Sequence, residues 1–592
     1  MTGKKKLLKC QKLRNNEYYD MQSVFDKLYE NSLAKRGFKN LISIITTEEN
    51  IKLAYRNLKK NAGSKTPGTD NKTIADLAKM SETELIETVQ RKFNWYQPQA
   101  VRRKEVPKGN GKMRPLGIPT IMDRLIQQCV LQVMEPICEA KFCETSNGFR
   151  PNRGVENALA QAEKHMQKGN LHIVIDIDVK GFFDNVHHGK LLRQIWAMGI
   201  HDKKLLSIIS AMLKAEVVDM PTRHEYSGRI HATGTKDQSK KYRELRKTKL
   251  KECYIVRYAD DFKIFCRKHS DAVRLFAAVK AWLKERLNLD ISPEKSKIVN
   301  LKHDYSDFLG FRIKVHKGKK NQYIVVSHIA PKALQKIKET AKEKVKAIQH
   351  SSDNMAEYAA VNHYNSYVMG IHNYYGMATA ANPDMQTLAY EIKISIKNRL
   401  QERVKRRSNQ SIPHYAEQYA KSKEIRFIGQ TILLPIGHVQ HHPPIHKKKS
   451  INKYTPVGRA EIHKNLESVD MGILHFLMRN PIANATIEYN DNRISLYVAQ
   501  KGVCAITKEP LTPEQIHCHH KTPVSLGGGD EYTNLIIVHE RVHRLIHATN
   551  SETISAILQT LQLKPAQLKK LNQLRKRAGN EAITLEQSLK SV

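Results

Sequence analysis

Two apolar, β-branched runs that each end in carboxylates constrain this chain more than any other feature. The run "CYIVRYADDFKIFCR" places Asp260 and Asp261 at a tight turn between two short strands, and "LHIVIDIDVKGFF" ends its strand at Asp178. If these strands are neighbours in one sheet, three acidic side chains converge, and buried like charges repel strongly. A divalent cation compensates this repulsion, and Mg²⁺ prefers such hard oxygen ligands. The pattern predicts an Mg²⁺ site, with a simple turn-capping Asp-Asp pair as the alternative.

The charge balance indicates a polyanionic partner. Lys and Arg number 99 against 58 Asp and Glu, which gives a formal net charge of +41. Nucleic acid or an anionic membrane surface fits this excess better than a merely basic surface does. We expect no membrane span, since no run of about 18 apolar residues is present. The start also lacks the apolar segment of a secretory signal, so an intracellular protein is expected, in the cytoplasm or nucleoid of a bacterium or in an organelle.

The order of the expected elements predicts an α+β multidomain fold. Residues 20–165 are mostly helical by pattern, interrupted by a basic hairpin at 106–124, and strands then alternate with helices. A basic, helix-dominated stretch follows, and after it a Pro/His/Lys-rich one. The eight cysteines lack the spacing of a zinc ribbon, so free thiols are expected. The predicted domains are 1–165, 166–325, 326–430, 431–495 and 496–592.

Several motifs in chain order resemble the reverse-transcriptase family, specifically the proteins encoded by group II introns. The motif "YADD" at Tyr258–Asp261 matches the family's polymerase turn, and "DVKGFFDN" at Asp178–Asn185 matches its first metal-binding strand. The other matches are "GSKTPGTD" (63–70), "PKGNGKMRPLGIPT" (107–120), "SNGFRP" (146–151), "SPEKSKIVN" (292–300) and "FLGF" (308–311). The resemblance covers nearly the whole chain.

The resemblance implies a right-hand polymerase, in which the first four predicted domains are fingers, palm, a helical thumb (domain X) and a basic DNA-binding segment. The thumb would grip the intron RNA and help it splice. Its basic face would comprise Lys332, Lys336, Lys338, Lys342, Lys344 and Lys346. Tyr364, Tyr367, Tyr374 and Tyr375 either stack on unpaired bases or pack the helical core.

The same resemblance implies roles for residues in and near the palm. The Mg²⁺ ligands would be Asp178, Asp260, Asp261 and the carbonyl of Val179. Lys112 and Arg114 would contact the incoming triphosphate, which suits their charge. Lys295 would neutralise or protonate the pyrophosphate leaving group, with an ordinary solvated lysine as the alternative. Two nearby acids, Asp176 and Asp184, are expected as a strand-edge residue and a turn cap.

One family motif is missing from the palm. Members carry a Pro-Gln-Gly loop and a helix between the two metal-binding strands, where they shape the nucleotide and template pocket. Here the Pro98-Gln99 pair lies in the fingers, and the gap falls near 217–220. An internal deletion explains the gap better than a divergent loop, because the sequence after it lacks apolar periodicity. Polymerase activity is then at risk even with all three carboxylates present.

The last hundred residues contain a dense histidine cluster. His543 and His547 are four apart and share a helix face, while His519 and His520 end a short strand before a Gly-rich turn at 527–529. A strand and a helix can hold one cation between them. The spacing resembles the HNH nuclease motif and implies a C-terminal ββα-metal domain.

This second resemblance implies one divalent metal, Mg²⁺ or similar. Its ligands would be His519, His543 and His547. His520 would be the general base that activates water, and Asn534 would orient it. His539 is a competing ligand, since it lies four residues before His543.

No structural zinc is expected in this domain. The family commonly frames the motif with cysteine pairs on a zinc ion. Here Cys504 faces Thr507 where a second cysteine would stand, and Val542 occupies another such position. Packing is then left to hold the domain together.

Together the resemblances imply a group II intron maturase and RNA-directed DNA polymerase with an HNH DNA endonuclease. Its partners would be the intron RNA, target DNA and deoxynucleotide triphosphates. The nuclease would nick one DNA strand and the exposed end would prime reverse transcription, which supports intron mobility. The alternative is an RNA-binding splicing factor with a defective polymerase, and a free-standing DNA endonuclease is disfavoured by the polymerase motifs. The sequence leaves open whether the chain forms a homodimer.

Overall fold

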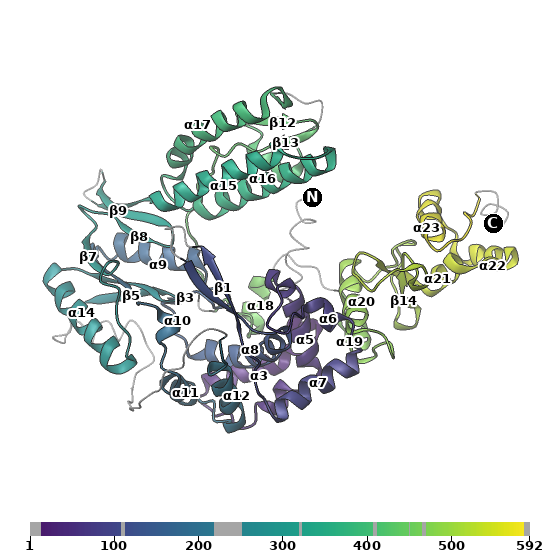
Figure 1. The fold of residues 1–592 in the computed structure, drawn as a ribbon, viewed down its shortest axis with the longest axis horizontal. Coiled ribbons are helices and arrows are strands. Elements are labelled where there is room, and N and C mark those ends of the chain that lie inside the picture. The colour runs from purple at the N-terminus through teal and green to yellow at the C-terminus, as the bar shows by residue number, and fades with distance from the viewer. Residues whose placement is uncertain are drawn as a thin grey trace.

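The computed structural model describes residues 14–107, 113–217, 252–318, 322–406, 411–448, 450–463 and 469–584. In Figure 1 the helical fingers lie at the bottom and the palm sheet lies to their left. The thumb lies at the top, and the C-terminal domain extends to the right, away from the palm. None of the helices within these ranges is both long enough and apolar enough to cross a membrane.

The fingers are helices around one apolar core. They comprise α2 (Asn15–Tyr18), α3 (Gln22–Leu33), α4 (Ile42–Ile45), α5 (Glu48–Lys59), α6 (Ile74–Ala78), α7 (Glu82–Asn94) and α8 (Ile121–Lys141). Helix α5 begins where the Thr47 side chain accepts a hydrogen bond from the Asn50 N–H. Acids in its first turn and bases in its last complement the helix dipole.

A hairpin projects from the fingers, as predicted, but it begins before the predicted segment 106–124, and residues 121–124 already belong to α8. Strand β1 (Arg102–Pro107) pairs antiparallel with β2 (Met113–Ile118). Directly after β2, the Thr120 side chain accepts from the Asp123 N–H and starts α8. The hairpin is thereby anchored at the first turn of the longest fingers helix.

The palm is a five-stranded sheet in the order β3-β5-β6-β4-β7. Its strands are β3 (Ser146–Asn147), β4 (Ile173–Asp178), β5 (Cys253–Tyr258), β6 (Asp261–Cys266) and β7 (Lys297–Asn300). The two runs that the sequence predicts as neighbouring strands are indeed adjacent, since β4 pairs antiparallel with β6. Two further helices, α11 (His188–Ala197) and α12 (Lys203–Leu213), follow β4 in the chain and pack against the fingers core.

The two faces of the sheet are covered by different helices. Side chains alternate between faces along each strand, so Val174 and Phe265 share a core with α9 (Val155–Gln167). Ile175 and Ile264 point to the other face and share a core with α14 (His269–Trp282).

The thumb is a three-helix unit on a small sheet. It follows the hairpin formed by β9 (Phe311–Lys317) and β10 (Tyr323–Ile329), against which β8 (Ser306–Phe308) pairs. Its helices are α15 (Pro331–Gln349), α16 (Asn354–Tyr375) and α17 (Ala381–Leu400). A second sheet joins β11 (Val404–Lys405), β12 (Arg426–Ile428) and β13 (Thr431–Leu433), so the thumb continues past the boundary predicted at 430.

The four thumb tyrosines lie in or against the core, in line with the packing alternative for them. Tyr364 is 1% exposed, and Tyr367, Tyr374 and Tyr375 pack around the same apolar cluster. The Tyr374 hydroxyl donates to the carbonyl of Leu309 over 2.8 Å. The rings are therefore turned inward in this structure.

After the thumb, the chain returns to the fingers. The N–H groups of Ile445 and Lys447 donate to Glu156 and Asn157 of α9, which fastens the Pro/His/Lys-rich stretch to the palm. Then α18 (Pro456–Ile462), α19 (Met471–Arg479) and α20 (Ile487–Ala499) follow. Leucines of α19 and Ile487 and Ile494 of α20 belong to the fingers core. The predicted segment 431–495 is thus shared between the thumb and the fingers.

A buried ionic network joins α20 to the fingers. Asp491 lies 2.8 Å from Arg56 and 2.9 Å from Lys59, and the Tyr19 hydroxyl donates to it over 2.5 Å. These partners hold the pKa of the Asp491 carboxyl well below its ordinary value despite its burial. Because a buried carboxylate is stable only when paired, the network fixes the position of α20 on the fingers.

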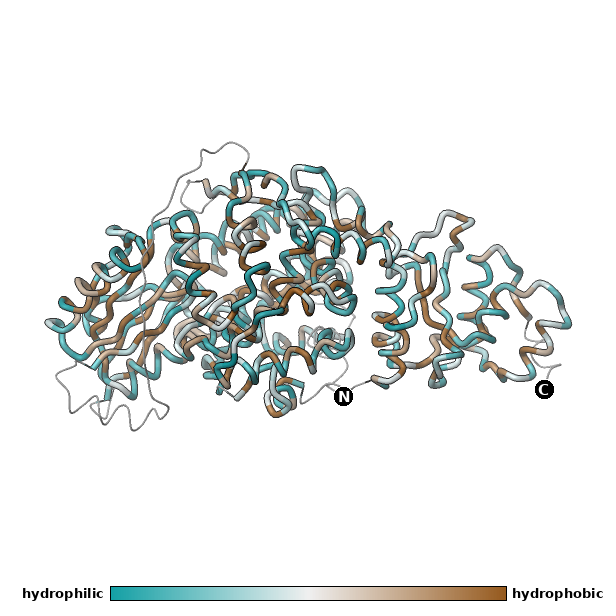
Figure 2. The backbone as a smooth tube through the Cα atoms, turned by 90° about the horizontal axis from the view of Figure 1, so that it is seen from below, coloured by the Kyte–Doolittle hydropathy of each residue, from teal (hydrophilic) through white to brown (hydrophobic). Residues whose placement is uncertain are grey.

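The C-terminal domain has a core of its own. Strands β14 (Ile516–His520) and β15 (Leu535–His539) pair antiparallel, and α21 (Glu540–His547) follows β15 directly. Helices α22 (Ser551–Leu561) and α23 (Pro565–Arg577) pack on α21. Figure 2 shows this domain at one end of the molecule.

Replacing Asp491→Ala should strongly destabilise the fingers, because it leaves the buried Arg56 guanidinium without its carboxylate. Breaking a buried pair in this way costs about 3–5 kcal/mol. The midpoint of urea denaturation measures the loss. The exposed-acid control Asp304→Ala should change the free energy of unfolding by less than about 0.5 kcal/mol. Equal midpoints for the two variants would contradict the role given to the network.

Candidate functional sites

The palm sheet places two of the three predicted carboxylates opposite each other. In the β4–β6 register Asp178 faces Asp261, and Tyr258 faces Asp261 across the β5–β6 turn. The turn itself is Ala259 and Asp260, with Ala259 at a φ of 54°. This left-handed conformation is strained for a non-glycine residue. It is held by neighbouring backbone, since the Ala259 N–H donates to the Asn147 carbonyl of β3.

The electrostatics of this turn favour a bound cation. Burial, opposed by Lys263 and reinforced by the carboxylates of Asp176, Asp178 and Asp260, raises the pKa of Asp261 to about 6. Lys295 Nζ lies 2.9 Å from Asp178 Oδ2, so the lysine contacts the carboxylate directly. The carboxylates of Asp178 and Asp261, which face each other in the register, are the kind of ligand that Mg²⁺ takes in phosphoryl-transfer sites.

Asp176 does not have the strand-edge position that the sequence predicts. Strand β4 lies between β6 and β7, so Asp176 is buried at the centre of the sheet. Lys263 Nζ lies 2.5 Å from its Oδ1, and the Ser306 hydroxyl donates to both of its oxygens. The ion pair with Lys263 therefore neutralises the buried Asp176. The other nearby acid, Asp184, is exposed in α10 (Phe182–Asn185).

The other predicted palm residues lie as follows. Val179 is buried and forms a bridge with Ile291. Lys112 lies outside the described residues, and Arg114 is described only as a backbone position of β2, opposite Val106. Of the predicted gap at 217–220, only the first residue lies within the described ranges.

An apolar cavity of about 500 Å³ opens beside Asp260. Its walls include Ile255 of β5, Phe182 after β4, and Trp282 at the end of α14. Ile255 is 40% exposed and Trp282 54% exposed. The sequence predicts β5 as a buried strand, whereas the Ile255 side chain is partly exposed at this cavity.

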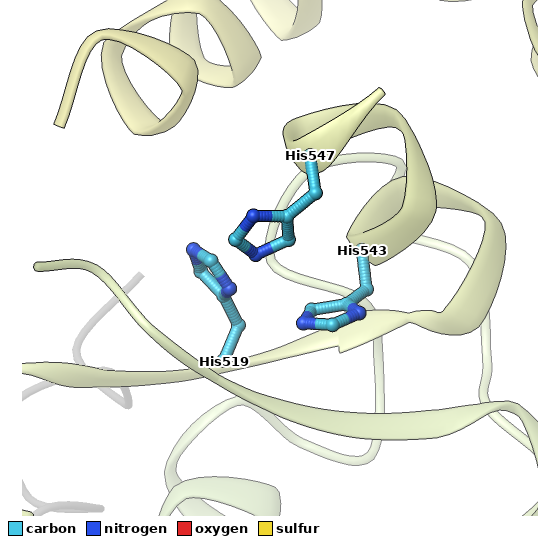
Figure 3. A group of neighbouring side chains, drawn as sticks. All are labelled: His519, His543 and His547. Carbon is cyan, nitrogen blue, oxygen red and sulfur yellow. The ribbon is translucent and has the colours of Figure 1, made fainter. Parts of the chain in front are cut away.

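Three histidines of the C-terminal domain converge (Figure 3). His519 comes from β14 and His543 and His547 from consecutive turns of α21, and one nitrogen of each lies within 4.8 Å of the others. His519 is 2% exposed, and its Nε2 is buried without a hydrogen-bond partner. An unsatisfied buried nitrogen is costly unless something binds it. A strand and a helix thus present three imidazoles to one point, which suits a divalent cation.

Burial keeps these imidazoles neutral. Together with the neighbouring histidines, it lowers the pKa of His519 to about 3 and of His543 to about 4. Burial also lowers the pKa of His547. A neutral imidazole offers the lone pair that a metal ion needs, so the cluster is prepared for a ligand role.

His520 faces away from this cluster and contacts an acid. Its Nε2 lies 2.7 Å from Asp530 Oδ1, and its ring stacks on Tyr489 with centroids 5.4 Å apart. Asp530 and Tyr489 are functional candidates that the sequence analysis missed. An acid beside a Gly-rich turn is ordinary by pattern, and only the folded loop brings it to the histidine.

Asn534 organises the loop between the two strands. Its Oδ1 accepts from the Thr522 N–H over 2.9 Å, and its Nδ2 donates to the carbonyls of Thr522 and Gly529. A Cβ at Gly528 would lie 1.9 Å from the Thr522 oxygen, so the turn requires glycine there. In the structure the polar contact to His520 comes from Asp530, while Asn534 fixes the loop that carries it.

His539, the alternative metal ligand, and Cys504 have other contacts. His539 caps α21, because its Nδ1 accepts from the Arg541 N–H over 3.0 Å. Cys504 is buried, and its Sγ accepts from the His539 N–H. Thr507 is also buried. The absence of a structural zinc stays a prediction.

Comparison with known proteins finds relatives over the palm and beyond. The family described as "Reverse transcriptase (RNA-dependent DNA polymerase)" matches residues 106–313. Protein YkfC of Escherichia coli is 28% identical over 338 residues, which are 49% of this chain and 87% of YkfC. Group II intron-encoded protein LtrA of Lactococcus lactis is 27% identical over 432 residues, 58% of this chain and 71% of LtrA.

Other relatives are more distant. The putative COX1/OXI3 intron 2 protein of Saccharomyces cerevisiae is 24% identical over 368 residues, 51% of this chain and 42% of that protein. A telomerase structure from Candida albicans covers 52% of this chain and 61% of its own at 11% identity, and its TM-score of 0.28 is too low to carry an argument. The reverse transcriptase match ends at residue 313, so the histidine cluster rests on its own geometry.

Divalent-metal binding in the palm should weaken on acidification. Asp261 must lose its proton to bind a cation, and its pKa is about 6. The affinity for Mn²⁺, followed by electron paramagnetic resonance, should therefore fall as the pH is lowered from about 7 to about 5. The measurement uses a His519→Gln/His543→Gln background, which removes the second cluster. Asp261→Asn should bind Mn²⁺ weakly at every pH, whereas the exposed control Asp184→Asn should keep the pH dependence of the parent protein. If the parent protein binds Mn²⁺ equally well at every pH, the role given to Asp261 is refuted.

Metal-free protein should lose stability as the pH falls from about 6.5 to about 4. The folded pKa values of His519 and His543 are about 3 and about 4, so the unfolded chain binds more protons in this window. Urea denaturation of chelator-treated protein measures the slope of the unfolding free energy with pH. His543→Gln should reduce the slope, and the exposed control His303→Gln should leave it unchanged. If the unfolding free energy of the parent protein does not change with pH in this window, the imidazoles are not buried in neutral form.

Proposed function

We propose that this chain, a relative of the group II intron reverse transcriptases and maturases, binds intron RNA, assists its splicing and copies RNA into DNA. We also propose that its C-terminal domain is an HNH-type nuclease that nicks the DNA target. The observation that carries the polymerase part is the β4–β6 register, which puts Asp178 opposite Asp261 within the matched region. This arrangement supports metal-dependent phosphoryl transfer.

In the palm, each residue has a defined task. Asp178 and Asp260, with Asp261 and the Val179 carbonyl, would hold Mg²⁺. The bound Mg²⁺ would neutralise the attacking and leaving oxygens of phosphoryl transfer. Lys295, already in contact with Asp178, is placed to neutralise or protonate the pyrophosphate. Lys112 and Arg114 would grip the triphosphate from the hairpin.

RNA binding would rest on charge more than on stacking. The net charge of +41 favours contact with phosphates, and such contacts make affinity strongly salt-dependent. Lys332, Lys336 and Lys346 are exposed along α15, while Lys338 and Lys342 lie near Glu391 of α17. The buried thumb tyrosines leave the lysines as the main candidates for this surface.

In the nuclease, His519, His543 and His547 would hold a divalent ion, Mg²⁺ or similar. The bound ion would stabilise charge on the scissile phosphate. His520 would take a proton from the attacking water, and Asn534 would keep the loop in place. The DNA end released by the nick would prime reverse transcription, which supports intron mobility.

A second candidate function is splicing assistance without competent polymerisation. The absence of the family's Pro-Gln-Gly motif from the sequence favours it, and an apolar cavity of about 500 Å³ lies beside Asp260. A polymerase depends on shape around the incoming nucleotide as well as on metal ligands. The carboxylates alone therefore do not secure polymerisation.

Paired splicing and primer-extension assays with one protein preparation separate the two functions. The full chain with its intron RNA should accelerate splicing, and the acceleration should fall steeply as salt is raised. cDNA synthesis on an RNA template with Mg²⁺ should be lost in Asp178→Asn, whereas splicing assistance should survive in that variant. Splicing without any cDNA from the parent protein selects the second candidate, and failure of both assays rejects the proposal.

A further inference from the structure

Asp530 is held in place from two sides. Its Oδ1 lies 2.7 Å from His520 Nε2, and its Oδ2 accepts from the Thr486 hydroxyl over 2.6 Å. Its carbonyl accepts from Asn492 Nδ2 over 2.8 Å. Thr486 caps the N-terminus of α20 and Asn492 lies in its second turn, so this helix fixes the acid that contacts the histidine.

The ring of His520 is restrained by the same helix. Tyr489 of α20 stacks on it with an interplanar angle of 20°, and the Tyr489 hydroxyl donates to the Cys518 carbonyl over 2.7 Å. Stacking fixes the plane of the imidazole, and the Asp530 contact fixes its rotation. The orientation of His520 is thus determined outside the three-histidine cluster shown in Figure 3.

The contact with Asp530 also selects the tautomer. A carboxylate only accepts hydrogen bonds, so His520 Nε2 must carry the proton and donate. Nδ1 is then left with its lone pair, and that lone pair is what a general base uses. Asp530 does not need to touch substrate for this effect.

Helix α20 is itself docked on the fingers. Thr486 forms a bridge with Ser81, and the Ile487 N–H donates to the Met80 carbonyl over 2.9 Å. Lys59 of α5 donates to Asn492 Oδ1 over 2.9 Å. The residues that hold Asp530 are therefore bonded to the polymerase part of the chain.

We propose that Asp530 is a positioning residue of the nuclease, which orients His520 with Nε2 protonated, and that α20 transmits this restraint from the fingers. This proposal rests on the proposed nuclease function, because the orientation of a general base matters only if the domain cleaves DNA. It adds that the nuclease base is set by a helix shared with the fingers. Cleavage of DNA by the C-terminal domain is then physically linked to the attachment of this domain to the fingers.

Nicking of supercoiled plasmid DNA with Mg²⁺ by the full chain provides the first test. His520→Ala should abolish nicking. Asp530→Asn should lower kcat on the order of 100-fold, because the amide can donate to Nε2 and favour the wrong tautomer, with KM within about twofold of the parent. Thr486→Val should lower kcat about tenfold, and Thr486→Ser should restore it, since serine keeps the hydroxyl that donates to Asp530 and accepts from the Tyr489 N–H. The neighbouring-acid control Glu531→Gln should match the parent.

The tautomer of His520 provides a second test that does not need nuclease activity. In ¹⁵N-histidine-labelled full-length protein, the signal lost in His520→Ala should show a protonated Nε2, and Asp530→Asn should change it. If the parent nicks DNA but Asp530→Asn keeps its kcat, the inference fails and the nuclease stands. If the parent does not nick DNA, the nuclease proposal fails. In that case a proton on Nδ1 of His520 overturns the inference as well. A proton on Nε2 that depends on Asp530 upholds the orientation of His520.

Discussion

Like charges held opposite each other in antiparallel register are the constraint on which the palm depends. Asp178 and Asp261 face each other because β4 pairs with β6, and cross-strand like charges are unfavourable unless something compensates them. Lys263 compensates Asp176 deeper in the same two strands, and Lys295 contacts Asp178 at their end. Asp260 and Asp261 at the turn leave negative charge for which a metal ion is the natural partner.

The same rule links the fingers with the C-terminal domain through α20. Asp491 is buried and therefore needs Arg56 and Lys59, which sets the helix on the fingers. The beginning of that helix then carries Thr486 and Tyr489 to His520 and its acid. One helix thus satisfies a buried charge on one side and holds His520 and Asp530 on the other, which would give the proposed polymerase and the proposed nuclease a common support.

Much of this arrangement is visible in the sequence, because it depends on local pattern. The strands around the "YADD" turn, the hairpin before α8 and the shared helix face of His543 and His547 all follow from period and spacing. Lys263 could have been found too, since a lysine inside an apolar strand needs an acid, and Asp176 sits in the facing run. The contact of Asp530 with His520 could not, because loop closure and the docking of α20 place it. The exposure of Ile255 on β5 could not be predicted either, because the apolar pattern of a strand does not tell how much of each side chain stays exposed.

The central claim is that this chain works on the RNA of a group II intron. Ultraviolet crosslinking of the full-length protein in its native cells, followed by sequencing of the bound RNA, tests it most directly. The account predicts that the crosslinked reads concentrate on one structured intron, with contacts that include α15 of the thumb. Reads scattered over abundant cellular RNAs without enrichment of any intron would contradict it.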